Sequence, residues 1–193
     1  MVRISLVLIT VFGVNSGLVG SAQAQDSPKN LYKIYSNLGK TLVGSCYSRT
    51  EGWDVGLGQS MAMAFSPKVN AEVKVVVLGL LYYSGEDVAT VSINEDADGL
   101  PGKAIHTWTL RNLGKQLWHG CYTSIAKSKQ GIPLTQGNQY WLVAEAPRTT
   151  LDPWSWTYIE AEGKFAYEEN GEGWKADNGY LSAYGVFGTE SGQ

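Results

Sequence analysis

Most of the chain alternates short apolar runs with clusters of turn residues, and no long segment repeats with the period of an amphipathic helix. Residues 73–83 are almost continuously apolar, which predicts a central strand covered on both faces. In residues 88–93 the apolar positions alternate, so that Ala89, Val91 and Ile93 share one face of a half-buried strand. The hydrophobic pattern therefore predicts β-structure.

Similar β-prone runs, each bounded by turn-forming residues, recur along the rest of the chain. They are residues 56–65, 104–110, 121–126, 139–146, 154–159 and 181–187. Pro133 cannot donate to a β-ladder, which places residues 130–137 in a loop or edge segment. About eight or nine strands without a repeat or linker predict an all-β domain, a two-sheet antiparallel sandwich of jelly-roll-like architecture.

The N-terminus has the pattern of a secretory signal peptide. Arg3 supplies a short positive segment, residues 4–11 are apolar, and Ala22–Ala24 matches the small-residue cleavage rule. The alternative, an anchoring helix, is disfavoured because the apolar segment is too short to span a bilayer. We therefore expect residues 1–24 to be removed and the protein to be secreted, into the extracellular space or the periplasm.

The remaining chain divides into two parts. Residues 25–55 are expected to form an N-terminal leader and first strand region, with residues 25–37 loosely tied, and residues 56–190 to form the sandwich domain. The chain has 15 basic and 18 acidic residues, a net charge of −3, and no basic run. This balance argues against nucleic acid as a partner, and no second apolar stretch is long enough to insert into a membrane.

Cys46 and Cys121 are the two cysteines of the chain. Export would bring them into an oxidising compartment, where we expect them to form a disulfide. Closing so long a loop would stabilise the fold by about 4 kcal/mol in the chain-entropy treatment. The alternative is a pair of free thiols.

One turn is dense in carboxylates. Asn94, Asp96 and Asp98 lie at every second position and are followed by Gly99, as the first ligands and the glycine do in a calcium-binding loop. The twelfth position, where a bidentate Glu belongs, is Ile105, so an EF-hand is excluded. Two alternatives remain: a partial oxygen cage that binds calcium, or a hairpin turn whose Asp side chains accept backbone N–H bonds.

The chain has seven tryptophans, which raises the question of a stacking surface for sugars. Trp154 and Trp156 would share one face of a strand, either as ligand-stacking residues or as part of the core of a sandwich. Trp53 and Trp174 are flanked by glycines and charged residues, which favours exposure. These four tryptophans are the candidate ligand-binding residues.

The sequence offers little support for catalysis. His106 and His119 lack the spacing and third ligand of a zinc site. The predicted mature chain contains no Gly-x-Ser-x-Gly elbow and no phosphate-binding loop. Glycoside hydrolysis would require two carboxylates facing each other across a cleft, for which Asp152 and Glu160 are candidates.

Several motifs occur together in one order. They are Asp-Gly-x-Pro-Gly at residues 98–102, Leu-Thr-x-Gly-x-x-Tyr-Trp at 134–141, Trp-x-Trp at 154–156 and Gly-Thr at 188–189. In this combination the chain resembles the choice-of-anchor domains, a family of bacterial exported β-sandwich modules, over about residues 59–189. The resemblance implies a sandwich fold and export but no established activity. The chain shows no C-terminal sorting signal, so surface attachment is not expected.

We therefore expect an exported, non-catalytic β-sandwich module with a binding role, for which a glycan or another extracellular surface ligand is the candidate partner and calcium the candidate ion. The first alternative is a structural matrix protein that associates with itself. The second is a small glycoside hydrolase based on carboxylates.

Overall fold

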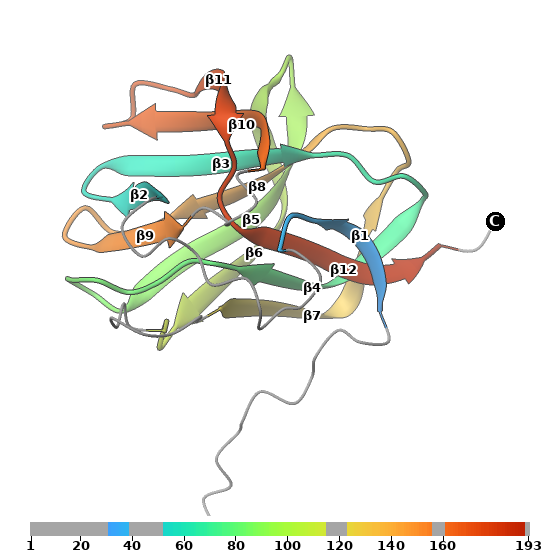
Figure 1. The fold of residues 1–193 in the computed structure, drawn as a ribbon, viewed down its shortest axis with the longest axis horizontal. Coiled ribbons are helices and arrows are strands. Elements are labelled where there is room, and N and C mark those ends of the chain that lie inside the picture. Colours follow the sequence, from blue (N-terminus) through green and yellow to red (C-terminus); the bar gives the residue numbers. More distant parts are fainter. Residues whose placement is uncertain (1–30, 39–51, 115–122, 156–160, 192–193) are drawn as a thin grey trace, which may run out of the picture.

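The computed structural model describes residues 31–38, 52–114, 123–155 and 161–191. In these ranges the chain forms β-strands and no helix (Figure 1). The strands are β1 (Tyr32–Ser36), β2 (Gly52–Gly56), β3 (Gln59–Phe65), β4 (Ala71–Leu78), β5 (Val88–Ala97), β6 (Leu100–Arg111), β7 (Ser124–Leu134), β8 (Tyr140–Glu145), β9 (Leu151–Ser155), β10 (Glu162–Glu169), β11 (Lys175–Tyr180) and β12 (Tyr184–Glu190).

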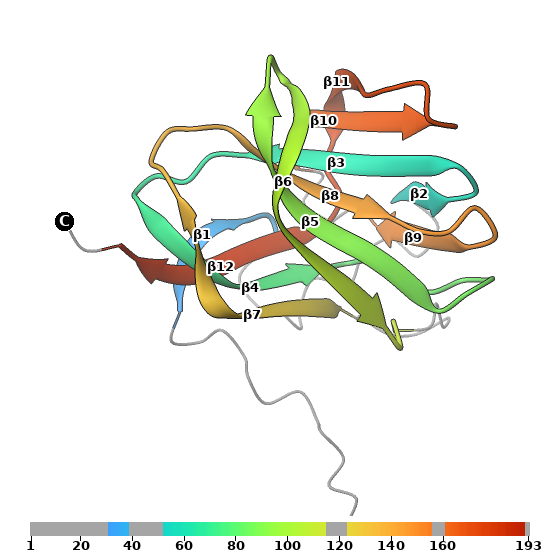
Figure 2. The ribbon, with the colours of Figure 1, turned by 180° about the vertical axis from the view of Figure 1, so that it is seen from behind.

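The strands form two antiparallel sheets packed face to face (Figures 1 and 2). The small sheet has the order β1-β12-β4-β7, and the large sheet has the order β11-β10-β3-β8-β5-β6, with β2 and β9 attached beside β3. Without β2, β9, β10 and β11, eight strands remain, and numbering them in chain order gives 1-8-3-6 and 2-7-4-5. This is the strand order of a jelly roll, so the predicted jelly-roll-like sandwich is confirmed.

The strands outside this eight-stranded frame were mostly not predicted. The described structure has twelve strands, against about eight or nine expected. The hairpin of β10 and β11 adds two strands to the edge of the large sheet beyond β3. Residues 130–137 were expected to be a loop or edge segment; β7 continues to Leu134, and as the last strand of the small sheet it tolerates Pro133.

The expectation that residues 25–37 are loosely tied is wrong where the structure describes them. β1 pairs with β12, and Ile34 is buried in the core. The side chain of Asn37 donates to the carbonyl of Ser182 at 2.8 Å and accepts from the backbone N–H of Tyr184 at 2.8 Å. This segment is held by backbone pairing with β12, which is far away in the sequence, so the local sequence pattern could not predict it.

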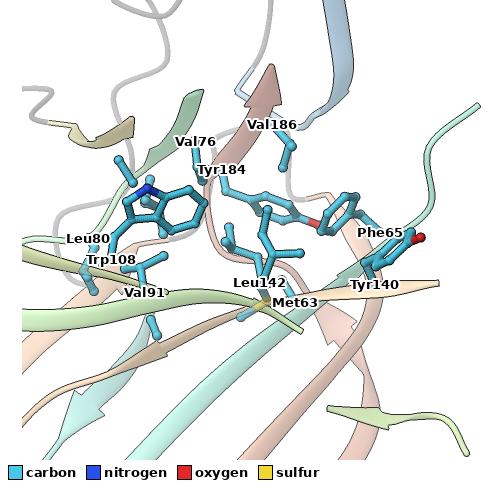
Figure 3. Packing of buried hydrophobic residues seen from close by; sticks show 14 of the residues in the cluster. Met63, Phe65, Val76, Leu80, Val91, Trp108, Tyr140, Leu142, Tyr184 and Val186 are labelled. Atoms are coloured by element: carbon cyan, nitrogen blue, oxygen red, sulfur yellow. The ribbon is translucent and has the colours of Figure 1, made fainter. Parts of the chain in front are cut away.

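The core fills the space between the two sheets. Tyr184 and Val186 of the small sheet face Met63, Phe65 and Leu142 of the large one (Figure 3). The hydroxyl of Tyr184 is fully buried and donates to a backbone carbonyl of β3 at 2.9 Å, which ties the sheets together. Burial raises the pKa of Tyr184 well above its usual value, so this hydroxyl keeps its proton.

The outer face of the small sheet is also buried at its centre. Val75 and Val77 of β4 pack there with Leu38 and Phe187. β4 has a neighbouring strand on each side, β12 and β7, and buried residues on each face. The prediction of a central, doubly covered strand is therefore confirmed for β4.

Candidate functional site

The acidic turn is the tip of the hairpin formed by β5 and β6. Ala97 pairs with Leu100, so Asp98 and Gly99 are the two turn residues, with φ angles of 54° and 84°. Two positive φ angles define the type I′ turn, which matches the twist of a hairpin and for which Asp-Gly is a preferred sequence. The hairpin rises beside the connection from β7 to β8 (Figure 2). The backbone of this segment therefore has the conformation of a hairpin turn, one of the two alternatives that the sequence left open.

The carboxylate of Asp96 is held by three donors. Its Oδ1 accepts from Trp141 Nε1 at 2.7 Å and from Gln139 Nε2, and its Oδ2 accepts from the backbone N–H of Gly99 at 3.0 Å. Partial burial raises the pKa of Asp96, but the hydrogen bonds and the charge of Lys164 together outweigh it and lower the pKa below its usual value. Asp96 is thus an ionised carboxylate in a fixed position.

Asn94 fixes the base of the same hairpin. Its Oδ1 accepts from the hydroxyl of Ser92 at 2.7 Å, and its Nδ2 donates to the carbonyl of Gly102 at 2.8 Å. No group of three or more Asp, Glu, His or Cys side chains that could hold a metal ion occurs among the described residues. Calcium binding by Asn94, Asp96 and Asp98 stays a prediction, and the side-chain oxygens of the first two already accept hydrogen bonds from N–H and O–H donors.

An open pocket of about 780 Å³ lies beside this hairpin, where the chain crosses from β7 to β8. Its described lining contains no Lys, Arg or His. Polar side chains come from Glu95, Asp96, Thr135, Asn138 and Gln139, and the remaining lining residues are Ile105, Pro133, Gly137 and Tyr140. The volume falls in the range of small-molecule sites, about 300–1,000 Å³, but the lining is more polar than is typical of them.

The β7–β8 connection that forms one wall of the pocket is anchored by hydrogen bonds at several points. The backbone N–H of Thr135 donates to the hydroxyl of Tyr140 at 2.9 Å, and that of Gln136 donates to Asn70 Oδ1 at 2.8 Å. Gly137 has a φ of 78°, which favours glycine at this turn. The wall is therefore preformed by the chain itself.

Trp141 is the residue of this region that the sequence analysis did not single out. Its side chain lies on the outer face of the large sheet with Ala62, Val143 and Ala166, and it is fully buried. The ammonium of Lys164 lies 5.4 Å from the centre of its ring, a cation–π arrangement. The sequence did contain a signal for this position. Trp141 directly follows Tyr140 in a strand, so one of the two aromatic side chains must lie on the outer face of the sheet.

The predicted stacking tryptophans do not form an exposed row. Trp154 is fully buried in the core, with its Nε1 donating to the carbonyl of Ala183 at 3.0 Å. Its prediction as a ligand-stacking residue is wrong, because a side chain without exposed surface has no face to offer a sugar. Trp53 is half-buried, 4.8 Å from the ring of Phe165, and Trp174 is partly buried against Trp141 and its neighbours.

Several predicted residues lie outside the described ranges. They are Cys46, Cys121, Trp156, His119 and Glu160. The expected disulfide, one of the four stacking candidates and one carboxylate of the proposed hydrolase therefore stay predictions.

Two carboxylates face one another on the outer side of the large sheet. Glu145 of β8 and Glu168 of β10 lie on either side of β3. Partial burial, followed by the charge of Glu168, raises the pKa of Glu145 above its usual value. Glu168 also accepts from the backbone N–H of Gly173 at 3.3 Å, so one of the two is engaged in holding a turn.

A second acidic location lies in β9. Asp152 is fully buried, and neither of its carboxylate oxygens has a hydrogen-bond partner. Burial, followed by the charge of Asp87, raises the pKa of Asp152 to about 7, although the backbone N–H of Tyr83 lies close enough to stabilise the ionised form in part. Asp152 is separate from the hairpin pocket, whose lining does not include it.

Comparison with known proteins gives no family assignment: no family model matches the sequence, and no curated protein matches it significantly. The resemblance to choice-of-anchor domains therefore stays a prediction. In the described part of the chain, no helix is long and apolar enough to cross a membrane.

Proposed function

We propose that this chain is an exported, non-catalytic binding module that takes a glycan at the pocket between the β5–β6 hairpin and the β7–β8 connection. The observation that carries the proposal is the preformed polar lining of this pocket. Asp96 is locked by Trp141 and Gln139, and the β7–β8 wall is anchored through Thr135. Fixed acceptors and donors can bind hydroxyl groups without first becoming ordered, which reduces the entropic cost of binding.

The composition of the lining favours a neutral sugar. Glu95 and Asp96 give the pocket negative charge, and no cationic side chain is among its described lining residues. Carboxylates and amides hydrogen-bond sugar hydroxyls, whereas an acidic ligand such as a uronic acid, sulfate or phosphate would meet like charge. Ile105, Pro133 and Tyr140 supply apolar surface for the C–H faces of a sugar ring.

Binding is tested by measuring the melting temperature of the protein with a panel of neutral and acidic oligosaccharides. At about 100 times Kd a ligand stabilises the fold by about 2.7 kcal/mol, which for a domain of this size raises Tm by about 5–10 °C. We expect a neutral oligosaccharide to produce such a shift and acidic ones to produce none.

Two variants test whether the ligand binds in the pocket. Asn138→Ala and Glu95→Gln each remove one lining group and should reduce the shift while leaving the Tm of the free protein unchanged. The matched controls are Asn178→Ala on β11 and Glu190→Gln at the end of β12, both exposed and outside the pocket lining. Equal shifts in all four variants would contradict the assignment of the site.

The same samples decide between the alternatives. Concentration-dependent sedimentation without any response to sugars would support a self-associating matrix protein. Release of reducing ends from a polysaccharide would support a glycoside hydrolase and contradict a non-catalytic role.

A further inference from the structure

β11 lies at one end of the large sheet (Figure 1). It pairs with β10 on one side, no described strand lies on its other side, and the side chains from Lys175 to Asn178 are exposed. A strand in this position presents backbone N–H and C=O groups along its free edge, and these groups can pair with a further strand. The large sheet can therefore be extended at β11.

The other end strands of the described sheets have features that oppose such pairing. β6, β7 and β9 contain Pro101, Pro133 and Pro153, and a proline removes a donor from the ladder. β1 is short, and its register against β12 shifts between Lys33 and Tyr35. β11 contains no proline and pairs with β10 over its whole length without a shift of register. Among these end strands, β11 is therefore the one that best accepts another strand.

The charges of β11 are complementary to those of a second, antiparallel β11. Lys175 and Asp177 lie at alternate positions, so their side chains share one face of the sheet, and Ala176 between them faces the other way. Two copies of an end strand can pair about a two-fold axis perpendicular to the sheet, and a residue on the axis then meets its own counterpart. With Ala176 on the axis, Lys175 of each copy lies opposite Asp177 of the other.

We propose that two copies of this chain form a dimer through antiparallel pairing of their β11 strands, centred on Ala176, which joins the two large sheets into one. This register gives two contacts of opposite charge directly across the strands, and such contacts stabilise a sheet. A register centred on Asp177 would bring two carboxylates together, which is destabilising. A register centred on Asn178 would place Asp177 opposite Gly179 and form no contact between opposite charges. The charges of β11 therefore select the register centred on Ala176.

Both charged side chains can exchange their present contacts for this pairing. The ammonium of Lys175 lies 3.2 Å from the carboxylate of Glu172, and Asp177 accepts from the backbone N–H of Asn178 at 2.8 Å. These contacts join near neighbours in the chain at exposed positions, where such interactions contribute little to stability. Replacing them by contacts between the two copies therefore costs little.

The dimer leaves the hairpin pocket accessible, because none of the described lining residues of that pocket belongs to β11. Two pockets in one assembly bind a polysaccharide with repeated units more tightly than one pocket does, through the high effective concentration of the second site. This consequence rests on the proposed glycan site, whereas the dimer itself does not.

The test is sedimentation equilibrium without sugar, at protein concentrations from about 10 μM to about 1 mM, because an interface of one strand pair is small and its dimer is weak. We expect the mass of the wild type to approach that of a dimer as the concentration rises. Asp177→Lys and Lys175→Asp each replace two attractive contacts by two repulsive ones and should weaken the dimer at least about tenfold.

An equimolar mixture of these two variants should form dimers as the wild type does, because opposite charges then face each other at both contacts. Glu190→Lys is the matched control, since it makes the same change of net charge at an exposed position of β12, and it should leave the dimer unchanged.

Three results would overturn the proposal: a wild type that stays monomeric, a dimer that both single variants leave unchanged, or a mixture that forms no dimers. Circular dichroism shows whether each variant is folded. If a single variant is not, the double variant with Lys175→Asp and Asp177→Lys decides, because it restores both contacts within one sequence and should dimerise as the wild type does. A monomeric double variant would contradict this register.

Discussion

The buried carboxyl group of Asp152 predicts an unusual dependence of stability on pH. Its pKa is about 7 in the folded chain and about 3.9 in an unfolded one. Between these values the folded state holds a proton that the unfolded state has released, so the free energy of unfolding falls as the pH rises. The difference of about 3 pKa units corresponds to a loss of up to about 4 kcal/mol between pH 4 and pH 7.

The variant Asp152→Asn removes this titration while keeping the shape of the side chain. We would measure the free energy of unfolding by urea denaturation at several pH values from 4 to 8 for both proteins. The free energy of unfolding of the wild type minus that of the variant should decrease steadily across this range and level off above pH 7. Asp98→Asn controls for the loss of one carboxylate. Parallel profiles for the wild type and Asp152→Asn would refute the argument, because the carboxyl group would then titrate alike in both states.

Three further predictions concern the fold and the hairpin. Trp154→Ala should lower the free energy of unfolding by about 3–5 kcal/mol, measured by denaturation, because it leaves a large cavity in the core. A double-mutant cycle with Trp141→Phe and Asp96→Ala should give a coupling energy of about 1.5–3 kcal/mol, as expected for a hydrogen bond to a charged group, and additive effects would contradict that bond. Gly188→Ala should prevent β12 from pairing with β4, because the new Cβ would lie 1.8 Å from a backbone oxygen of β4. Gly137→Ala has open space around it and only a φ of 78° to contend with, so it should lower the free energy of unfolding by about 1–2 kcal/mol. Equal losses of stability for the two variants in a thermal melt would contradict this difference.

Local features of the fold could be predicted from the sequence. The turn at Asp98 and Gly99 follows from the preference of that dipeptide for positive φ angles. The central position of β4 follows from its continuous apolar run. Such features depend on residues that are neighbours in the chain, so the pattern contains the information.

Features that depend on distant partners could not be predicted in the same way. Residues 162–180 are rich in acidic and small residues, and the hairpin of β10 and β11 forms there because β3 offers an open edge. An alternating pattern gives the face on which Trp154 lies but does not say that the opposite sheet covers it.

The candidate sites show the same limit. The sequence indicated Asp96 through its spacing, but its bond to Trp141 requires β5 and β8 to be adjacent. Asp152 was named as one candidate among many acidic residues, and its burial depends on the pairing of β9 with β2, which places it opposite Val55 of the core. Spacing along the chain therefore suggests candidate site residues, and the packing of the strands determines which of these candidates have the surroundings of a site.

The pairing of β1 with β12 has a consequence for the order of events during biosynthesis. The small sheet joins the first described strand to the last, and Asn37 bonds to residues beside β12. Such non-local pairing forms slowly, and here it cannot form until residue 190 has left the ribosome. The first strand of the small sheet therefore stays without its partner while all the intervening strands are synthesised, and the sheet closes only when β12 is available.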